Sequence, residues 1–231
     1  MAQQTPTEFL TDLYNRAMSV VGSNDKNISD LKPKEQELLN TVLQYSEQAK
    51  AVLTVLITSF VYKALHPEQD IRKHQASISG GYSGRTFDSK NITPFMKAHK
   101  FPSMAESGWL TRALEQKVSY DKNYSGAITP KELKPAFLSI LDNIEKGADC
   151  KKYLTFLLQG LIIKRNLQTI DLAKPTTLSI SSILELLTTH FNGSYKAEGA
   201  SRLPVLAIWA AWPLETRWPP GYPLLLFRYK D

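Results

Sequence analysis

Residues 51–65, AVLTVLITSFVYKAL, decide the fold class of this chain. The stretch contains one charged residue and no glycine or proline, and its apolar residues fall on nearly every side of a helix. A helix that is apolar all round is typical of the buried centre of a helical domain. Its uncharged apolar run ends at residue 62, well short of the roughly 20 residues that a membrane span needs. We therefore expect a soluble protein with no membrane partner, built around this helix.

Upstream of this stretch, apolar residues continue at mixed three- and four-residue steps from Pro33. This spacing predicts one long central helix over residues 33–65. The helix is expected to end at His66-Pro67, because the residue before a proline disfavours the helical region.

Helical signals also occur on both sides of the centre. Thr5-Pro6-Thr7-Glu8 combines a cap residue, a proline at the first helical position and a reciprocal glutamate, which predicts a helix over residues 6–21. Another predicted helix begins near residue 93, and the rest cover 104–118, 131–146, 150–165, 179–191 and 200–211. No stretch alternates with the period of two that a half-buried strand shows. The sequence predicts a mainly α fold: an irregular multi-helix domain with a long central helix and a glycine-rich loop.

The glycine-rich loop is predicted over residues 77–88, SISGGYSGRTFD, and basic residues surround it. The chain carries a net charge of +6, which favours a polyanionic partner, and Asp88 is the only acid between residues 71 and 105. Cations beside a loop with free backbone N–H groups suit phosphates, and an arginine can also fork onto a guanine edge. The predicted DNA-binding residues are Arg72, Lys73, Ser83, Arg85, Lys90, Lys97, Lys100 and Arg112. The alternative is a solvated basic face without a specific partner.

Residues 121–132, DKNYSGAITPKE, fit the twelve-residue calcium loop of EF-hands. Oxygen-bearing side chains occupy its ligand positions, and a glycine stands at position six. The predicted calcium ligands are Asp121, Asn123, Ser125, Thr129 and Glu132, between two flanking helices. The alternative is a polar turn between helices, capped by Asp121 and Thr129.

Nuclease chemistry requires an Asp and a Glu-x-Lys that bring Mg²⁺, water and phosphate together, commonly on adjacent strands. Two formal matches occur: Asp121 with Glu132 and Lys134, and Asp88 with Glu115-Gln116-Lys117. Prolines bracket the first match and the second lies in a predicted helix, so neither has the expected strand context. The sequence assigns no catalytic motif, and Asp121, Glu132 and Lys134 are the fallback.

Cysteine use and the N-terminus bear on the compartment. Cys150 is the single cysteine, so an internal disulfide is excluded and the chain suits a reducing environment. The N-terminus lacks the basic segment and apolar core of a secretory signal. We expect a cytoplasmic protein.

Residues 79–116, SGGYSGRTFDSKNITPFMKAHKFPSMAESGWLTRALEQ, and residues 201–208, SRLPVLAI, resemble a group of bacterial type II restriction endonucleases. The resemblance implies a largely helical N-terminal part followed by a metal-dependent nuclease core that hydrolyses duplex DNA with Mg²⁺. It also implies that the core, with its Asp and Glu-x-Lys, follows residue 208.

Beyond residue 208 the sequence departs from that pattern. Residues 209–231, WAAWPLETRWPPGYPLLLFRYKD, hold three of the four tryptophans and four of the thirteen prolines. Either the reading frame of a longer enzyme was lost there, or this is a genuine tail that packs on the domain. We predict a helical DNA-recognition domain over residues 1–208 and an atypical tail over residues 209–231.

The expected function is therefore DNA binding by the N-terminal part of a type II restriction endonuclease, with no catalytic activity assigned to this chain. A homodimer is a further expectation, since symmetric DNA sites favour two-fold proteins. A calcium-responsive interaction module and a plain helical scaffold are the alternative functions.

Overall fold

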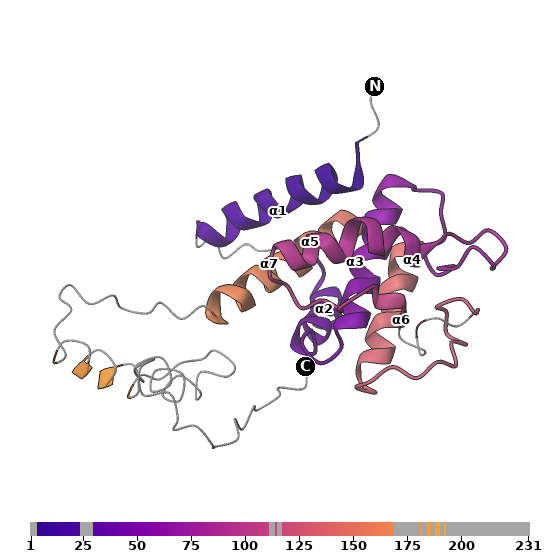
Figure 1. Cartoon of the computed structure of the whole chain (residues 1–231). Helices are drawn as coiled ribbons and strands as arrows, with labels where there is room; N and C mark the ends of the chain where they lie inside the picture. Colours follow the sequence, from indigo (N-terminus) through magenta and orange to yellow (C-terminus); the bar gives the residue numbers. More distant parts are fainter. Residues whose placement is uncertain are drawn as a thin grey trace, which may run out of the picture. The chain divides into compact units, whose positions relative to one another are not determined.

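The computed structural model describes residues 4–23, 30–110, 114, 117–168, 181, 184, 185, 188, 189 and 192. These residues form helices and connecting loops, with no strand among them (Figure 1). The prediction of a mainly α fold is confirmed. The chain divides into two units, Met1–Asn166 and Leu167–Asp231. The predicted helix over residues 200–211 and the predicted tail from residue 209 lie outside the described residues, as do parts of the helix predicted over 179–191.

Helix α3 (Lys50–Leu65) is the core of the first unit. Every residue from Ala51 to Val61 is buried, as its all-round apolar sequence predicts. Its buried hydroxyls donate to carbonyls one turn earlier, from Thr54 to Lys50 at 2.8 Å and from Thr58 to Thr54 at 2.7 Å. The polar groups of α3 are thereby satisfied without water.

Helix α2 (Pro33–Gln44) is separate from α3, so the prediction of one helix from residue 33 to residue 65 is wrong. The chain turns between Tyr45 and Ala49, and Lys164 of helix α7 (Cys150–Gln168) donates to the Leu43 carbonyl and to the Ser46 hydroxyl, both at 2.8 Å. The turn itself is partly buried, since Ser46 is 1% and Ala49 7% exposed. The apolar spacing therefore continues through a break that periodicity alone does not reveal.

Helix α1 (Pro6–Gly22) forms as predicted. The Glu8 backbone N–H donates to the Thr5 hydroxyl, and the Thr5 N–H donates to the Glu8 carboxylate, which completes the capping box. The apolar face of α1, with Leu10 and Ala17 fully buried, contacts α3.

A helical segment with a wide turn follows the glycine-rich loop: α4 (Gly84–Phe87), the π-helix η1 (Asp88–Ile92) and α5 (Thr93–Ala98). The predicted loop therefore ends at Ser83 and not at residue 88. In the π-turn the Thr93 N–H donates to the Asp88 carbonyl, five residues earlier, and Pro94, which has no N–H to donate, follows directly after it.

The predicted helix over residues 104–118 is wrong within the described residues. The 3₁₀-helix η2 (Gly108–Leu110) is the helical element there, and the remaining described positions are turns, bends and irregular chain. The start of η2 is fixed by hydrogen bonds from Ser107 and Gly108 to Asp88, which replace the bonds of a continuous helix.

Helices α6 (Leu133–Glu145) and α7 (Cys150–Gln168) confirm the last two helices predicted for this unit. α6 packs against α2, and α7 approaches α2 where Gly160 lies against Leu43. Gly147, at φ +99°, ends α6 with N–H bonds from Gly147 to Ile144 and from Ala148 to Asn143. Among the described residues, no helix is both long and apolar enough to cross a membrane.

Candidate nucleic-acid interface

Asp88, the only acid between residues 71 and 105, is turned into the protein. Its side chain is fully buried, and it accepts hydrogen bonds of 2.7 Å from the Thr93 hydroxyl, the Ser107 hydroxyl and the Gly108 N–H. Burial raises the pKa of this carboxyl, and the bonds from Ser107 and Thr93 act in the opposite direction. Asp88 joins the start of η1 to the start of η2.

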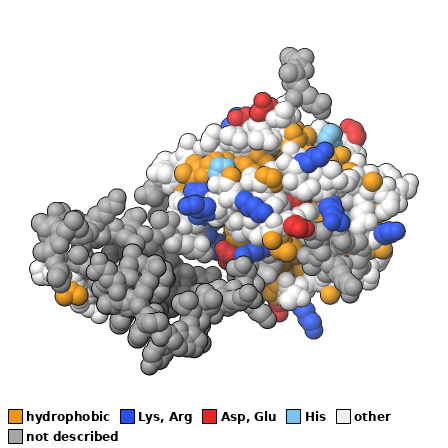
Figure 2. Space-filling view, viewed as in Figure 1, with side chains coloured by type: hydrophobic (Ala, Val, Ile, Leu, Met, Phe, Trp, Pro, Cys, Tyr) orange, Lys and Arg blue, Asp and Glu red, His pale blue; other side chains and the backbone are white. Residues whose placement is uncertain are grey.

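The exposed charges that remain on the α4–α5 segment are positive. Arg85, Lys90, Lys97 and Lys100 are all exposed, and Figure 2 shows Lys and Arg side chains over the part of the surface where Figure 1 places α4 and α5. Lys97 also donates to the Ala105 carbonyl. We call these four cations the cationic surface: the first three lie on about 18 Å of helical chain from Arg85 to Lys97, and Lys100 follows the end of α5.

The uncharged polar side chains of this segment bond to neighbours within it. The Ser83 hydroxyl donates to the Thr86 hydroxyl at 2.7 Å, and the Ser89 hydroxyl to the Arg85 carbonyl at 3.0 Å. The Asn91 amide donates to the Phe87 carbonyl at 2.9 Å. These donors stabilise the helical turns on which the cations stand.

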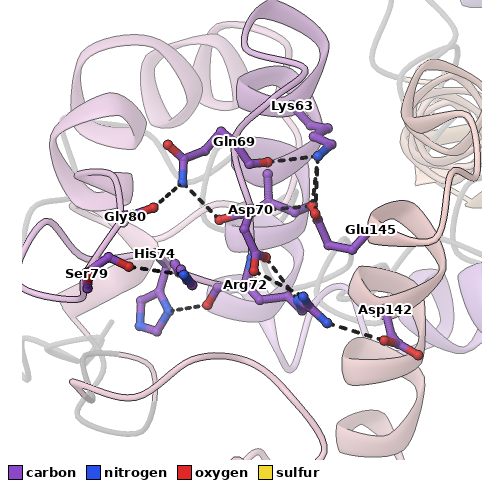
Figure 3. A network of polar contacts seen from close by, with 11 residues as sticks. Lys63, Gln69, Asp70, Arg72, His74, Ser79, Gly80, Asp142 and Glu145 are labelled. Carbon is purple, nitrogen blue, oxygen red and sulfur yellow. Dashed lines mark hydrogen bonds and ion pairs between the residues drawn. The ribbon is translucent and has the colours of Figure 1, made fainter.

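Arg72 lies in a network of ion pairs (Figure 3). Its guanidinium bonds both carboxylate oxygens of Asp70, at 3.0 and 3.1 Å, and lies 3.5 Å from Asp142 of α6. The hydrogen bond with Asp70 raises the pKa of Arg72. The charge of this predicted DNA contact is therefore balanced inside the protein.

The same network fastens the chain after α3 to α6. Glu145 accepts from the Ile71 N–H at 3.1 Å and pairs with Lys63 of α3 at 3.2 Å. Lys63 also donates to the Gln69 carbonyl at 2.8 Å (Figure 3). Sequence reasoning gave Asp142 and Glu145 no role, because nothing in the sequence relates them to residues about 70 positions earlier.

Backbone N–H groups of the glycine-rich loop donate hydrogen bonds to carbonyls within the loop and just before it. The N–H groups of Gly81, Tyr82 and Gly84 donate to backbone carbonyls of residues 73–82 at 2.8–3.1 Å. Lys73 donates to the Ser79 carbonyl at 3.1 Å. The expectation that this loop presents free N–H groups to phosphate is wrong for these three positions, because the loop folds back on itself.

Five of the predicted DNA contacts, Ser83 and the four residues of the cationic surface, thus lie in one segment from Ser83 to Lys100. Arg72 and Lys73 lie before it in bonds to the protein itself, and Arg112 lies outside the described residues. The burial of Asp88 had one sequence signal: it is a solitary acid within a long basic stretch.

The predicted calcium loop is a turn in which Asp121 accepts from the Asn123 N–H at 2.8 Å. α6 begins after it at Leu133, but residues 117–120 before it are not helical, so no helix leads directly into the loop. Tyr124 is buried and packs on Tyr120, with ring centroids 5.1 Å apart. The described residues contain no group of three or more His, Cys, Asp or Glu side chains that could hold a metal. Calcium binding at Asn123, Ser125 and the other ligand positions stays a prediction.

Of the fallback catalytic residues, Asp121 begins this loop, Glu132 ends it and Lys134 lies in α6. Glu132 is exposed, and the Lys134 ammonium lies 5.6 Å from the centre of the Tyr124 ring. Since the described part of the chain contains no strand, it does not supply the strand context that their nuclease role presupposes. The second formal match includes residues 115 and 116, which lie outside the described residues.

No protein-family model, curated protein or solved structure matches this chain.

Proposed function

We propose that this chain binds duplex DNA through the cationic surface and is the DNA-binding part of a type II restriction endonuclease, whose intact form hydrolyses DNA with Mg²⁺. The observation that carries the proposal is the burial of Asp88 beneath exposed Arg85, Lys90, Lys97 and Lys100. A basic segment whose one carboxylate faces inward presents a single sign of charge to a polyanion.

The charge density of duplex DNA favours it as the partner of this surface. Duplex DNA carries one negative charge per about 1.7 Å of axis, so the roughly 20 Å of the cationic surface faces several phosphates at once. Each neutralised phosphate releases counterions, and four contacts give a slope of log affinity against log salt of about −3.6. Binding should therefore weaken roughly 10²-fold between about 50 and 200 mM salt.

The assignment to restriction endonucleases rests on the resemblance of residues 79–116 and 201–208. The cationic surface lies inside the first of these blocks, so the electrostatic argument and the resemblance concern the same residues. The proposal for this chain is binding and not cleavage, because no catalytic set is assigned to it.

The test is duplex binding by the full chain across a salt series, with and without Mg²⁺, with cleavage followed in the same samples. We expect binding with a slope near −3.6 and no cleavage. A variant with Arg85, Lys90, Lys97 and Lys100 changed to Gln should lose the salt-dependent binding. The matched control changes four other exposed lysines to Gln: Lys34, Lys117, Lys122 and Lys131.

The control removes the same net charge, so it distinguishes binding by the cationic surface from attraction of DNA by the overall charge of +6. Equal losses in the two variants, or no binding by the native chain at low salt, would overturn the proposal. Cleavage by the native chain would overturn the binding-only role, and Asp121, Glu132 and Lys134 would then be the first residues to change.

A further inference from the structure

We infer that Arg165 of α7 is a positioning residue that holds the backbone of Lys100 for contact with a DNA phosphate, an inference that rests on the proposed function. Arg165 is not among the DNA contacts predicted from the sequence. Its guanidinium donates to the His99 carbonyl, 66 residues earlier in the chain, at 3.2 Å. It acts through Lys100 and not on the phosphate itself.

Lys100 stands at a backbone position that lysine rarely occupies. Its φ is +56°, in the left-handed region, and it comes just after the end of α5. Glycine is the usual residue at such a position, because a Cβ atom crowds the backbone in this conformation. A lysine kept where the backbone favours glycine indicates a role for its charge.

Two backbone hydrogen bonds hold the peptide groups on either side of Lys100. The Lys100 N–H donates to the Lys97 carbonyl at 3.1 Å, and the Phe101 N–H donates to the Met96 carbonyl at 2.9 Å. This pair of bonds is the Schellman motif that ends many helices. Because peptide groups are planar, holding both of them sets the direction in which the Lys100 side chain leaves the backbone.

Arg165 adds a bond to the first of these two peptide groups. The His99 carbonyl that accepts from it lies in the same rigid plane as the Lys100 N–H. The last carbonyls of a helix have no partner within the helix, and a cation near them also interacts favourably with the helix dipole. Arg165 therefore holds this plane at its carbonyl, while the bond to Lys97 holds it at its N–H.

The Arg165 side chain is itself held in place by aromatic residues. It donates to the Tyr14 hydroxyl of α1 at 3.0 Å, and its guanidinium carbon lies 5.6 Å from the centre of the buried Phe101 ring. A guanidinium at this distance from an aromatic ring is attracted to it. Arg165 is partly buried, whereas Lys100 is exposed. The geometry thus assigns the phosphate contact to Lys100 and the support of its backbone to Arg165.

The experiment measures the salt dependence of duplex binding by the full chain in a double-mutant cycle of Arg165→Gln and Lys100→Gln. We expect each single variant to reduce the slope of log affinity against log salt by about 1, because each loses the contact of one lysine. The double variant should show the same reduction of about 1. The matched cycle pairs Arg165→Gln with Lys90→Gln, in η1, and there the two reductions should add to about 2.

Equal results in the two cycles, additive or not, would overturn the inference, because Arg165 would then contact DNA itself or support the whole surface. An unchanged slope in Arg165→Gln would also overturn it. Absence of duplex binding by the native chain at low salt would instead overturn the proposed function, and the inference with it.

Thermal unfolding identifies a variant that fails to fold. If Arg165→Gln fails, Arg165→Lys takes its place in both cycles, since it keeps the charge but not the forked donors. Its loss of affinity should then be present in the native background and absent when Lys100 is already Gln. No loss, or a loss that persists without Lys100, would overturn the inference.

Discussion

The hydroxyl of Ser107 donates a 2.7 Å hydrogen bond to the carboxylate of Asp88, nineteen residues earlier in the chain, and both residues are buried. The bond ties the segment that carries the cationic surface to the 3₁₀ turn beside α3. Asp88 therefore has two effects: it removes negative charge from the surface, and it fixes the turns on which the cations stand.

Asp88→Ala should lower the free energy of unfolding by about 2–4 kcal/mol, because it leaves the Ser107 hydroxyl and the Gly108 N–H without their acceptor and leaves the Thr93 hydroxyl with only the Glu106 carbonyl, at 3.3 Å. Asp88→Asn should cost less, since one amide oxygen can still accept from the Gly108 N–H. Urea unfolding measures both values. Asp12→Ala, on the exposed side of α1, is the control and should stay within about 0.5 kcal/mol of the native chain. Equal stability of Asp88→Ala and the control would contradict the anchoring role.

The raised pKa of Asp88 gives a pH dependence of defined sign. Burial disfavours the charged form, so the contribution of this group to stability is fully present below the unfolded-state pKa of about 3.9. It is lost as the pH rises through the folded-state pKa. The free-energy difference between the native chain and Asp88→Asn should therefore favour the native chain more as the pH falls from neutral toward 4.

The comparison with Asp88→Asn isolates this group. Asp70 and Asp142 have lowered pKa values and act with the opposite sign, but they are present in both chains and cancel in the difference. Urea unfolding across the pH series supplies the values. A difference that grows in the opposite direction would show that the hydrogen bonds outweigh burial.

Gly81→Ala should destabilise the glycine-rich loop by about 1–3 kcal/mol through overpacking. A Cβ atom at this position would lie 2.1 Å from the Gln75 carbonyl oxygen, which is backbone and cannot move aside cheaply. Gly22→Ala is the matched control, since nothing lies within 4 Å of its added Cβ. Thermal unfolding of the two variants checks the prediction, and equal melting temperatures would refute it.

These relationships show what the sequence could predict and what it could not. The N-terminal end of α1 follows from Thr5 and Glu8 alone, because the capping box joins residues three apart. The burial of α3 follows from its own composition, because it is apolar on nearly every side. The break at residues 45–49 and the π-turn at Asp88 depend on partners elsewhere in the chain, Lys164 and Ser107. The spacing of apolar residues along the chain does not predict contacts between distant residues.

The same limit applies to the candidate site. The basic stretch was visible in the sequence, and its four exposed members lie between residues 85 and 100, in α4, η1 and α5 and just after α5. The balance of Arg72 by Asp70 and Asp142 was not visible, because Asp142 lies on a helix that begins some sixty residues later. Whether a basic residue is available to bind DNA therefore depends on its ion pairs within the protein, which the sequence alone does not give.

Calcium tests the remaining alternative at residues 121–132. We expect Ca²⁺ to leave the melting temperature of the chain unchanged, because the Asp121 carboxylate is used in its own turn and no helix enters the loop at residues 117–120. Glu132→Gln removes the bidentate ligand of an EF-hand and is the control. A rise in melting temperature with Ca²⁺ that Glu132→Gln abolishes would restore the calcium-responsive module.

Arg72→Gln should separate stability from DNA binding. The substitution removes ion pairs to Asp70 and Asp142 that are about one-third exposed or less, so the free energy of unfolding should fall by about 1 kcal/mol. The slope of log affinity against log salt should stay close to that of the native chain, because this guanidinium is already balanced. Lys90→Gln, on the cationic surface, should instead reduce the slope by about 1. Urea unfolding and salt-dependent duplex binding on the same preparations measure both quantities. An equal reduction of the slope by both variants would extend the DNA contact surface to Arg72.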